Sequence, residues 1–264
     1  MKLLAFSLIA GFLASVFTNA AGVSAAMPRL DATPVAGVVG AEVLPRDAGE
    51  RREDLSAFSV NAWVASAVGR IDSGVLGLAL GAARCATASG AVTNPATLTI
   101  IDYSKPSVEP RMWVLDLETR ELVYEELVSH GQGSGGNLAT KFSNVPESHQ
   151  TSIGLFVTDQ TYVGRNGYSL RLDGLDEGFN DRARERAIVM HGAPYVNGSI
   201  TKSLGRLGRS HGCPAVRESV ARELINRVKG GSLVFAYYPD AEWLRTSKFL
   251  GNCGNLLQQV SKAS

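Results

Sequence analysis

Short apolar segments separated by turns fill the sequence from residue 97 to 238, and they constrain the fold more than any other feature. Each segment has the length and the β-branched or aromatic content of a strand, and turn residues lie between them. The pattern therefore predicts a mainly β fold, a sandwich or barrel. The predicted strands cover residues 97–101, 111–117, 121–130, 152–158, 168–172, 187–191 and 232–238.

Three stretches depart from the strand pattern. Residues 55–96 suggest helices broken around residues 69–74 and form a predicted N-terminal helical extension. Residues 131–136 contain four glycines and are predicted to be a flexible loop. Residues 218–229 form a predicted C-terminal helix. This helix belongs to a predicted catalytic domain over residues 97–245, and residues 246–264 form a tail after it. The apolar stripe of this helix is Val220, Leu224, Ile225 and Val228.

The N-terminus has the pattern of an export signal. Lys2 precedes a nearly unbroken apolar run over residues 3–17, and small residues at 18–20 and 23–25 offer cleavage sites. A membrane anchor is the alternative, but the run is short for a span and lacks a charged flank on its far side. We predict that residues 1–25 are removed on export to the periplasm or cell envelope. Residues 26–54 are then a linker or flexible arm, and no stable membrane span remains.

The charge of the chain argues against a nucleic-acid partner. The sequence has 26 basic and 25 acidic side chains, and loss of residues 1–25 removes only Lys2 from this count. The mature chain is then formally neutral. A balanced charge gives no support for binding to nucleic acid or for general attraction to an anionic surface.

The chain has three cysteines, an odd number for a protein in an oxidising compartment. Cys213 is the natural free thiol because of its surroundings, described below. Cys85 and Cys253 flank the predicted catalytic domain. They either form a disulfide that holds the ends together or are two buried small side chains, and spacing in the sequence does not distinguish these alternatives.

The run Ser210-His211-Gly212-Cys213-Pro214 is the strongest chemical signal. Glycine and proline on either side place the thiol on a tight turn, where the sulfur can be exposed and backbone N–H groups can converge. His191, from an earlier predicted strand, can take the proton of the thiol. A nucleophile, a base and donors for an oxyanion are the parts that acyl transfer through a thiolate requires.

The stretch around this run is basic, because residues 187–217 contain no aspartate or glutamate. Positive charge favours the thiolate form of a cysteine and attracts the carboxylates of a substrate. We therefore expect a reactive, solvent-accessible thiol in a positively charged site. The basic residues of the stretch are Lys202, Arg206, Arg209 and Arg217.

These motifs resemble the signature of the murein L,D-transpeptidase catalytic domain. His191-Gly192 followed by Ser210-His211-Gly212-Cys213 carries the resemblance, which extends over about residues 98–239. The flanking residues are more similar to a divergent second branch of the family than to its best-studied branch. The segments that resemble this branch are 101–107, 141–144, 167–172, 205–209 and 214–216.

The resemblance implies a two-step acyl transfer on peptidoglycan stem peptides, without a cofactor. Cys213 would attack the amide between the third residue and the terminal D-residue, and the thioester would pass to an amine of another stem or to water. His191 would be the general base, oriented by the backbone carbonyl of Gly192. Gly212 and Cys213 would supply N–H groups to the oxyanion. His211 is an alternative base, although the family pattern favours His191 and leaves His211 to shape the site.

One position departs from the better-studied branch, which has an arginine two residues after the nucleophile, where this chain has Ala215. Arg209 and Arg206 are therefore candidates for binding a substrate carboxylate, with Ser210 as a further contact. Tyr162 lies beside a glycine-punctuated hairpin that could cover the cleft, although a buried strand tyrosine is the more ordinary interpretation. The resemblance also suggests acylation by a carbapenem, whose strained carbonyl mimics the scissile amide.

Three other functions remain open. A wall-binding module without chemistry would need neither the thiol nor its base. Another wall-active cysteine peptidase or amidase is closer chemically, although such enzymes usually place the cysteine before the histidine. A zinc hydrolase is the third, but the chain has no HExxH and no paired CxxC motif. Its ligands would come from His130, His149, His191, His211 and Cys213.

Overall fold

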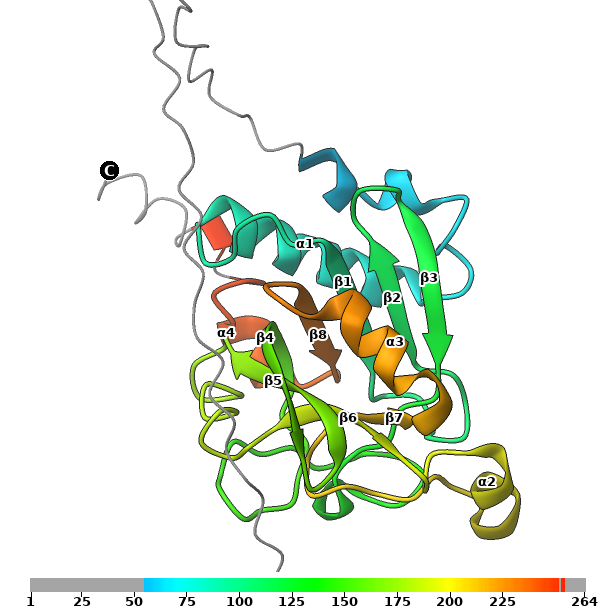
Figure 1. The fold of residues 1–264 in the computed structure, drawn as a ribbon. Coiled ribbons are helices and arrows are strands. Elements are labelled where there is room, and N and C mark those ends of the chain that lie inside the picture. The colour runs from blue at the N-terminus through cyan, green and yellow to red at the C-terminus, as the bar shows by residue number, and fades with distance from the viewer. Residues whose placement is uncertain (1–54, 252, 255–264) are drawn as a thin grey trace, which may run out of the picture. The chain divides into compact units, whose positions relative to one another are not determined.

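The computed structural model describes residues 55–251, 253 and 254 (Figure 1). In this part, the chain forms one sheet with helices on both of its faces. The predicted signal peptide (1–25), the predicted linker (26–54) and residues 252 and 255–264 of the predicted tail lie outside the described residues. No helix in the described part is long and apolar enough to cross a bilayer.

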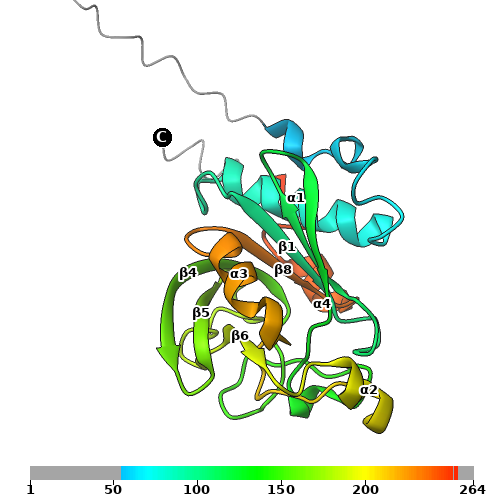
Figure 2. The same cartoon turned by 45° about the vertical axis from the view of Figure 1, so that its right-hand side comes forward.

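The described residues contain eight strands in the order β3-β2-β1-β8-β4-β5-β6-β7. The pairs β1–β8 and β6–β7 are parallel, and the other neighbours are antiparallel. The sheet twists and bends along this order, as an incomplete barrel does (Figure 2), and the predicted mainly β fold is confirmed. The strands are β1 (Thr97–Asp102), β2 (Met112–Asp116), β3 (Glu121–Glu126), β4 (Gly154–Gly164), β5 (Gly167–Gly174), β6 (Val189–Ala193), β7 (Ala215–Arg217) and β8 (Leu233–Tyr237).

The central strands are buried on both faces, and their successive side chains enter two different hydrophobic clusters. In β1, Leu98 and Ile100 belong to one cluster and Ile101 to the other. In β8, Phe235 and Val234 divide in the same way. Because side chains alternate between the two faces of a strand, a strand covered on both sides is apolar at nearly every position. This explains the continuous apolar runs that mark these strands in the sequence.

The helix α1 (Ser73–Ala88) covers the first face of the sheet, against β1 and β8 (Figure 1). The carboxylate of Asp72 caps the helix by accepting hydrogen bonds from the N–H groups of Gly74 and Val75, at 2.9 and 3.0 Å. Leu80 is fully buried in the first cluster. The predicted N-terminal extension is therefore helical, and its main helix is part of the hydrophobic core. Two short 3-10 helices precede it, η1 (Leu55–Phe58) and η2 (Val60–Trp63).

The helix α3 (Glu218–Val228) packs against the second cluster, in contact with β6, β1 and β5 (Figure 2). Of the predicted stripe, Leu224, Ile225 and Val228 are fully buried there, whereas Val220 is only half-buried. The helix ends one residue earlier than predicted. Its amphipathic pattern survives in the structure because only one side of the helix faces the sheet.

Four short elements are absent from the predicted set, namely β7, α2 (Gly198–Leu204), α4 (Ala241–Thr246) and the 3-10 helix η3 (Gln132–Ser134). Segments of this length show no periodicity that distinguishes them from loops. β7 exists because it pairs with β6. α4 begins where the side chain of Asp240 accepts a hydrogen bond from the N–H of Trp243, at 2.8 Å.

The predicted strand over residues 121–130 ends early, because the chain changes partner. β3 pairs with β2 only up to Glu126. Beyond it, the N–H of Ser129 donates to the carbonyl of Ala215 at 2.8 Å, and the carbonyl of His130 accepts from the N–H of Ser210 at 3.0 Å. The end of the predicted strand therefore supports the loop that carries Cys213.

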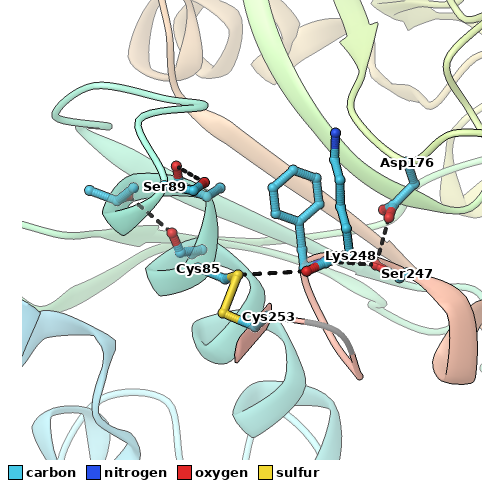
Figure 3. The surroundings of a disulfide bond; sticks show 10 residues. Cys85, Ser89, Asp176, Ser247, Lys248 and Cys253 are labelled. Carbon is cyan, nitrogen blue, oxygen red and sulfur yellow. Dashed lines mark hydrogen bonds between the residues drawn. A yellow bond between two sulfur atoms is a disulfide. The ribbon is translucent and has the colours of Figure 1, made fainter. Parts of the chain in front are cut away.

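Cys85 and Cys253 form a disulfide (Figure 3), the first of the two alternatives that the sequence left open. Their Cα atoms are 5.9 Å apart, although 168 residues separate them in the chain. The bond ties α1 to the segment after α4. Ser247 holds the same segment, because its hydroxyl donates to the buried carboxylate of Asp176 at 2.6 Å. Ser247 and Cys253 thus attach the end of the described chain at two points.

Candidate functional site: a cysteine and a histidine at the β6–β7 pair

Cys213 lies in a loop between α2 and β7 that its own serine closes. The hydroxyl of Ser210 donates to the carbonyl of Cys213 at 2.7 Å and accepts from the N–H of Gly212 at 3.1 Å. Gly212 has a φ of 121°, a conformation that side chains with a Cβ rarely adopt, so glycine suits this position. The hydroxyl of Thr151 donates to the carbonyl of Gly212 at 3.3 Å. Side chains inside and outside the loop therefore fix its shape.

The thiol of Cys213 is buried, whereas the sequence predicted an exposed thiol on a turn. The residue is 9% exposed. The N–H of Val189 donates to Sγ at 3.5 Å, and Sγ lies 3.7 Å from the carbonyl oxygen of Ala187. The prediction is wrong because the turn folds under the segment that leads into β6, and backbone groups of that segment enclose the sulfur.

Burial raises the pKa of the Cys213 thiol, because the thiolate would lose its hydration there. The N–H of Val189 and the guanidinium of Arg186 partly oppose this rise in the pKa. The cation that acts on the thiol is thus Arg186, which directly precedes the stretch 187–217. It is not one of the four basic residues predicted for this role. The resting side chain is a thiol, which needs a base before it can act as a nucleophile.

His191 on β6 is held in the tautomer that a general base requires. Its Nδ1 lies 2.9 Å from the backbone carbonyl oxygen of Gly192. A carbonyl oxygen can only accept, so Nδ1 carries the hydrogen and Nε2 keeps its lone pair. Burial lowers the pKa of the imidazole, and the hydrogen bond to Gly192 partly opposes this. The result is a neutral imidazole with a lone pair for a proton.

The glycine after His191 is required by the helix packed against it. A Cβ at Gly192 would lie 2.8 Å from the Cβ of Ala221 and 3.2 Å from the Cα of Glu218, both on α3. The close approach of α3 to β6 therefore depends on a residue without a side chain. The same residue supplies the carbonyl that orients His191, so helix packing and imidazole orientation share one position.

Parallel pairing of β6 with β7 brings the histidine and the cysteine loop together. His191 is the register partner of Ala215, which follows Cys213 by two residues. The N–H of His191 donates to the carbonyl of Pro214 at 3.4 Å. The sheet thus holds the backbones of β6 and of the Cys213 loop side by side. In the chain, α2 and its flanking loops separate these two segments.

The glycine-rich stretch 131–136 packs against the Cys213 loop. A Cβ at Gly131 would lie 2.3 Å from the carbonyl oxygen of His149 and 2.9 Å from the N atom of Gly212. A Cβ at Gly133 would lie 2.5 Å from the carbonyl oxygen of Ser148. Glycines at these two positions serve close packing of backbone segments rather than the predicted flexibility.

The predicted substrate-binding arginines lie on the surface around the loop. Arg209 is half-buried, and its Nη1 donates to the carbonyl of Gly135 at 2.7 Å. Nη1 of Arg206 donates to the carbonyl of Leu207 at 2.9 Å. Neither arginine has a carboxylate partner among the described residues. Both cations therefore remain available to an external carboxylate.

Arg217 is used differently, because it already has an acidic partner. Its Nε and Nη2 donate to the two carboxylate oxygens of Glu126 at 2.8 and 2.6 Å. Glu126 ends β3 and is almost fully buried. This ion pair joins β7 to β3 across the domain and gives Arg217 a structural role. The stretch around Cys213 is thus less positive than its sequence indicated.

Ser210 and His211 lie where the motif placed them, but their contacts differ from those predicted. Ser210 is buried, and its hydroxyl both donates and accepts a hydrogen bond inside the loop. The hydroxyl therefore has no free hydrogen to donate to a substrate, the contact predicted for it. His211 is exposed, and its ring stacks on the ring of His149 with the centroids 4.1 Å apart. No hydrogen bond joins the His211 side chain to Cys213 in the described structure.

Tyr162 lies on the same face of the sheet as His191, but two strands away. It is the register partner of Ser169, which in turn is the partner of His191. At the ordinary spacing of strands, this places the two backbones about 10 Å apart. The ring is half-buried and lies 4.4 Å from the guanidinium carbon of Arg171. Tyr162 is therefore at the edge of the site and not beside the thiol.

Two residues near the thiol were missed in the sequence, Arg186 and Tyr195. Burial raises the pKa of Tyr195 to about 12, and the nearby Cys213 thiolate adds to the rise. Tyr195 follows His191 by four residues. It packs against Gly208, where an added Cβ would lie 2.3 Å from the Cβ of Tyr195. Nothing in the sequence separates Tyr195 from the other tyrosines, or Arg186 from the arginines next to it.

The zinc alternative finds no ligand set in the part of the chain that the structure describes. There, no three side chains of His, Cys, Asp or Glu are grouped as ligands of a metal ion. His149 and His211 contact each other through parallel rings, at an interplanar angle of 11°. Stacked rings point their nitrogens outward in separate planes, so this pair does not form a chelate.

A family comparison decides the assignment. A family model described as the L,D-transpeptidase catalytic domain matches residues 68–237, more than half of the chain. The chain belongs to this family. The match begins before α1, so this L,D-transpeptidase domain includes the helix that covers the first face of the sheet. The resemblance that the His191 and Cys213 motifs indicated is confirmed.

Solved L,D-transpeptidases are distant in sequence from this one. An L,D-transpeptidase from Mycobacterium smegmatis is 16% identical, with 54% of this chain and 59% of that chain covered and a TM-score of 0.34. One from Xylanimonas cellulosilytica is 19% identical, with 55% and 62% covered and a TM-score of 0.31. LdtMt1, solved with imipenem, is 16% identical, with 54% and 59% covered and a TM-score of 0.33.

This L,D-transpeptidase domain thus spans about three fifths of the length of those chains, 59% for the Mycobacterium smegmatis protein. Among curated protein sequences, none matches the chain. The family assignment therefore depends on the match over residues 68–237.

Proposed function

We propose that this protein is an exported cysteine acyltransferase that acts on peptidoglycan stem peptides. Membership in the L,D-transpeptidase catalytic domain family supports the reaction class. The observation that carries the proposal is the pairing of β6 with β7. It places His191, with its tautomer fixed by Gly192, beside the backbone that follows Cys213. In this proposal Cys213 is the nucleophile and His191 the general base.

In the acylation step, the amide bond of the substrate is replaced by a thioester bond to Cys213, and one proton passes from the thiol to the leaving amine. Nε2 of His191 takes the proton of the Cys213 thiol, and the sulfur attacks the carbonyl carbon between the third stem residue and the terminal D-residue. The tetrahedral intermediate collapses, and the amine of the D-residue leaves with the proton from His191. A thioester remains on Cys213. The broken amide supplies the energy for the next step, so no nucleotide cofactor is needed.

The oxyanion of this step would be held by backbone N–H groups of the loop. The N–H of Cys213 is one proposed donor. The N–H of Gly212, proposed for the same role, donates to Ser210 Oγ in the structure. It reaches an oxyanion only if that hydrogen bond opens. One donor of this kind typically contributes about 10²–10³-fold to the rate.

The second step releases the acyl group. A side-chain amine of another stem attacks the thioester, loses its proton to His191 and forms a link between third residues, while the thiolate leaves. Water in place of the amine gives carboxypeptidation. Arg209 and Arg206, which lack carboxylate partners, are the proposed contacts for a substrate carboxylate. An Arg209→Gln variant with a raised KM and an unchanged kcat would support this contact.

Carbapenems are proposed as covalent inhibitors of the same thiol. A carbapenem carbonyl is strained, and attack by Cys213 opens the lactam ring to give a thioester without a leaving group. Intact-protein mass spectrometry after incubation should therefore show one added drug mass, absent in Cys213→Ala. A folded, substrate-active protein that never forms the adduct would contradict this inhibition.

Export to the periplasm or cell envelope is part of the proposal. Two features support it, the signal-like pattern over residues 1–25 and the disulfide between Cys85 and Cys253. Disulfides persist in oxidising compartments and are rare in the cytosol. N-terminal sequencing of the protein recovered from the cell envelope should find the chain beginning after residue 20 or 25. A chain that retains Lys2 in the cytosol would contradict export.

Mass spectrometry of products from defined tetrapeptide muropeptides tests the function directly. Loss of the terminal D-residue with formation of cross-linked dimers indicates transfer, and loss without dimers indicates hydrolysis. Cys213→Ala should form neither product. Cleavage at another amide would instead favour a different wall-active cysteine peptidase or amidase. Binding of muropeptides without any product in the intact protein would favour a wall-binding module.

A further inference from the structure

Arg186 is a partly buried arginine without a carboxylate. Arg182 and Arg184, in the same segment before β6, each form ion pairs with acidic side chains. No ion pair of Arg186 occurs among the described residues. Burial lowers the pKa of this guanidinium, as expected for a cation that has lost water without gaining an anion. A positive charge that is partly buried and has no carboxylate partner requires an explanation.

The guanidinium of Arg186 is fixed by neutral acceptors from one stretch, residues 143–152. Nη2 donates to the carbonyl of Gln150 at 2.6 Å and to the hydroxyl of Ser148 at 3.2 Å. Nη1 donates to the carbonyl of Ser143 at 2.5 Å and to the hydroxyl of Ser152. Nε is buried and has no hydrogen-bond partner within the described part of the chain. These bonds set the position of the charge but do not neutralise it.

This position lies directly against the Cys213 loop. A Cβ at Gly212 would lie 2.8 Å from the carbonyl oxygen of Gln150, which accepts from Arg186, and 3.5 Å from Nη2 itself. Arg186 also precedes Ala187, whose carbonyl faces Sγ of Cys213 at 3.7 Å. The negative charge that this guanidinium meets is therefore the one that appears when Cys213 loses its proton.

We propose that Arg186 is the counter-charge of the Cys213 thiolate, held in place by its hydrogen bonds to the 143–152 stretch. Arg186 is then a positioning residue that acts through Cys213. The proposal rests on the proposed role of Cys213 as nucleophile. It explains how a thiol enclosed by backbone can still ionise, because a fixed cation stabilises the anion without having to reorient. It also explains why the basic residues after β6 are not needed for this purpose.

The pH dependence of Cys213 alkylation by iodoacetamide tests the proposal in the mature chain. This reaction needs no peptidoglycan substrate, so its outcome is independent of the proposed acyl transfer. An opposite charge within a few ångströms typically lowers a pKa by one to three units. Arg186→Gln should therefore move the alkylation midpoint at least about one unit higher and slow alkylation at neutral pH about tenfold.

Two further variants separate charge from shape. Arg186→Lys keeps the charge but loses most of the hydrogen bonds, and its midpoint should stay close to that of the parent protein. Arg182→Gln removes a charge from the same segment, where Arg182 pairs with Glu185, and should leave the midpoint unchanged. A parental midpoint in folded Arg186→Gln would overturn the proposal. So would Arg186→Lys with a raised midpoint, which also decides the question if the glutamine variant does not fold.

Discussion

The two cysteine regions of this protein are both buried, yet their surroundings are opposite in character. Cys85 is 1% exposed and Cys213 is 9% exposed. Cys85 belongs to an apolar cluster of alanines, leucines and aromatic side chains, and its sulfur is bonded to that of Cys253. The sulfur of Cys213 instead faces a backbone N–H, a backbone carbonyl and the charge of Arg186.

The comparison shows that exposure does not distinguish a structural cysteine from a reactive one here. What differs is the direction of the dipoles and charges around the sulfur. An apolar cluster has no group that stabilises a thiolate, whereas the N–H of Val189 and the charge of Arg186 lower the cost of negative charge on the sulfur of Cys213. The Cys85 region should therefore control stability, and the Cys213 region should control chemistry.

The largest expected effect is the loss of turnover in Cys213→Ala. The thiol is the proposed nucleophile, so its removal should abolish product formation from tetrapeptide muropeptides. The folded state should change little, because the loop is held by Ser210 and Thr151 rather than by the thiol. Product formation by mass spectrometry and thermal unfolding check the two parts, with Cys85→Ala/Cys253→Ala as the active control. Normal turnover in Cys213→Ala would contradict the proposed role of Cys213 as the nucleophile.

A smaller loss is expected from His191→Ala, which leaves the nucleophile in place. Removal of a general base typically costs on the order of 10²–10⁴-fold in the chemical step. Single-turnover acylation should fall by this factor, while KM changes little. His149→Ala, which removes the half-buried histidine stacked on His211, is the control. If His211→Ala lost acylation and His191→Ala kept it, the assignment of the base would have to be exchanged.

On the structural side, loss of the disulfide should lower stability and leave the reaction intact. The bond closes a loop of 168 residues, and removal of a native disulfide typically costs about 2–5 kcal/mol of unfolding free energy. Cys85→Ala/Cys253→Ala should therefore unfold at a lower urea concentration than the oxidised parent protein. Per-molecule turnover below the unfolding transition should match the parent. A loss of turnover at full folding would mean that the two cysteine regions are coupled.

The largest part of the pH dependence of stability should come from the Cys213 side, at His130, with His191 adding to it in the same direction. The carbonyl of His130 accepts from the N–H of Ser210, and Nη2 of Arg111 donates to its Nδ1 at 2.7 Å. Burial and the charge of Arg111 lower the pKa of His130 to about 4, against about 6.5 when unfolded. Between these values only the unfolded chain takes up the proton. Stability is therefore complete above pH about 6.5 and falls as the pH drops, by up to about 3 kcal/mol near pH 4.

His130→Asn should flatten this dependence, because asparagine keeps an acceptor for Arg111 and cannot titrate. Urea unfolding at pH 7 and at pH 4.5 measures the difference. His149→Asn, at the ring that stacks on His211, is the control. An equal loss of stability at pH 4.5 in His130→Asn and the parent would place the titration elsewhere.

Much of the fold could be predicted because burial on both faces marks the central strands. β1 is buried at every position and β8 at all but its last, and each lies within a residue or two of its predicted range. The helix α3 was recognisable because one of its sides faces the sheet. β7 was not recognisable, because a strand of three residues has no pattern of its own and depends on β6 for its existence.

The sequence by itself determined the chemical groups of the site, their order and the family. His191, Gly192, Gly212 and Cys213 stand in a motif, and the family match agrees with it. Tertiary structure alone decided that the thiol is buried and that Arg186 is the cation beside it. It also decided that Arg217 is engaged by Glu126. Residue type fixes what a side chain can do, whereas solvation and neighbouring charge, which set pKa and reactivity, depend on segments that only the folded sheet brings together.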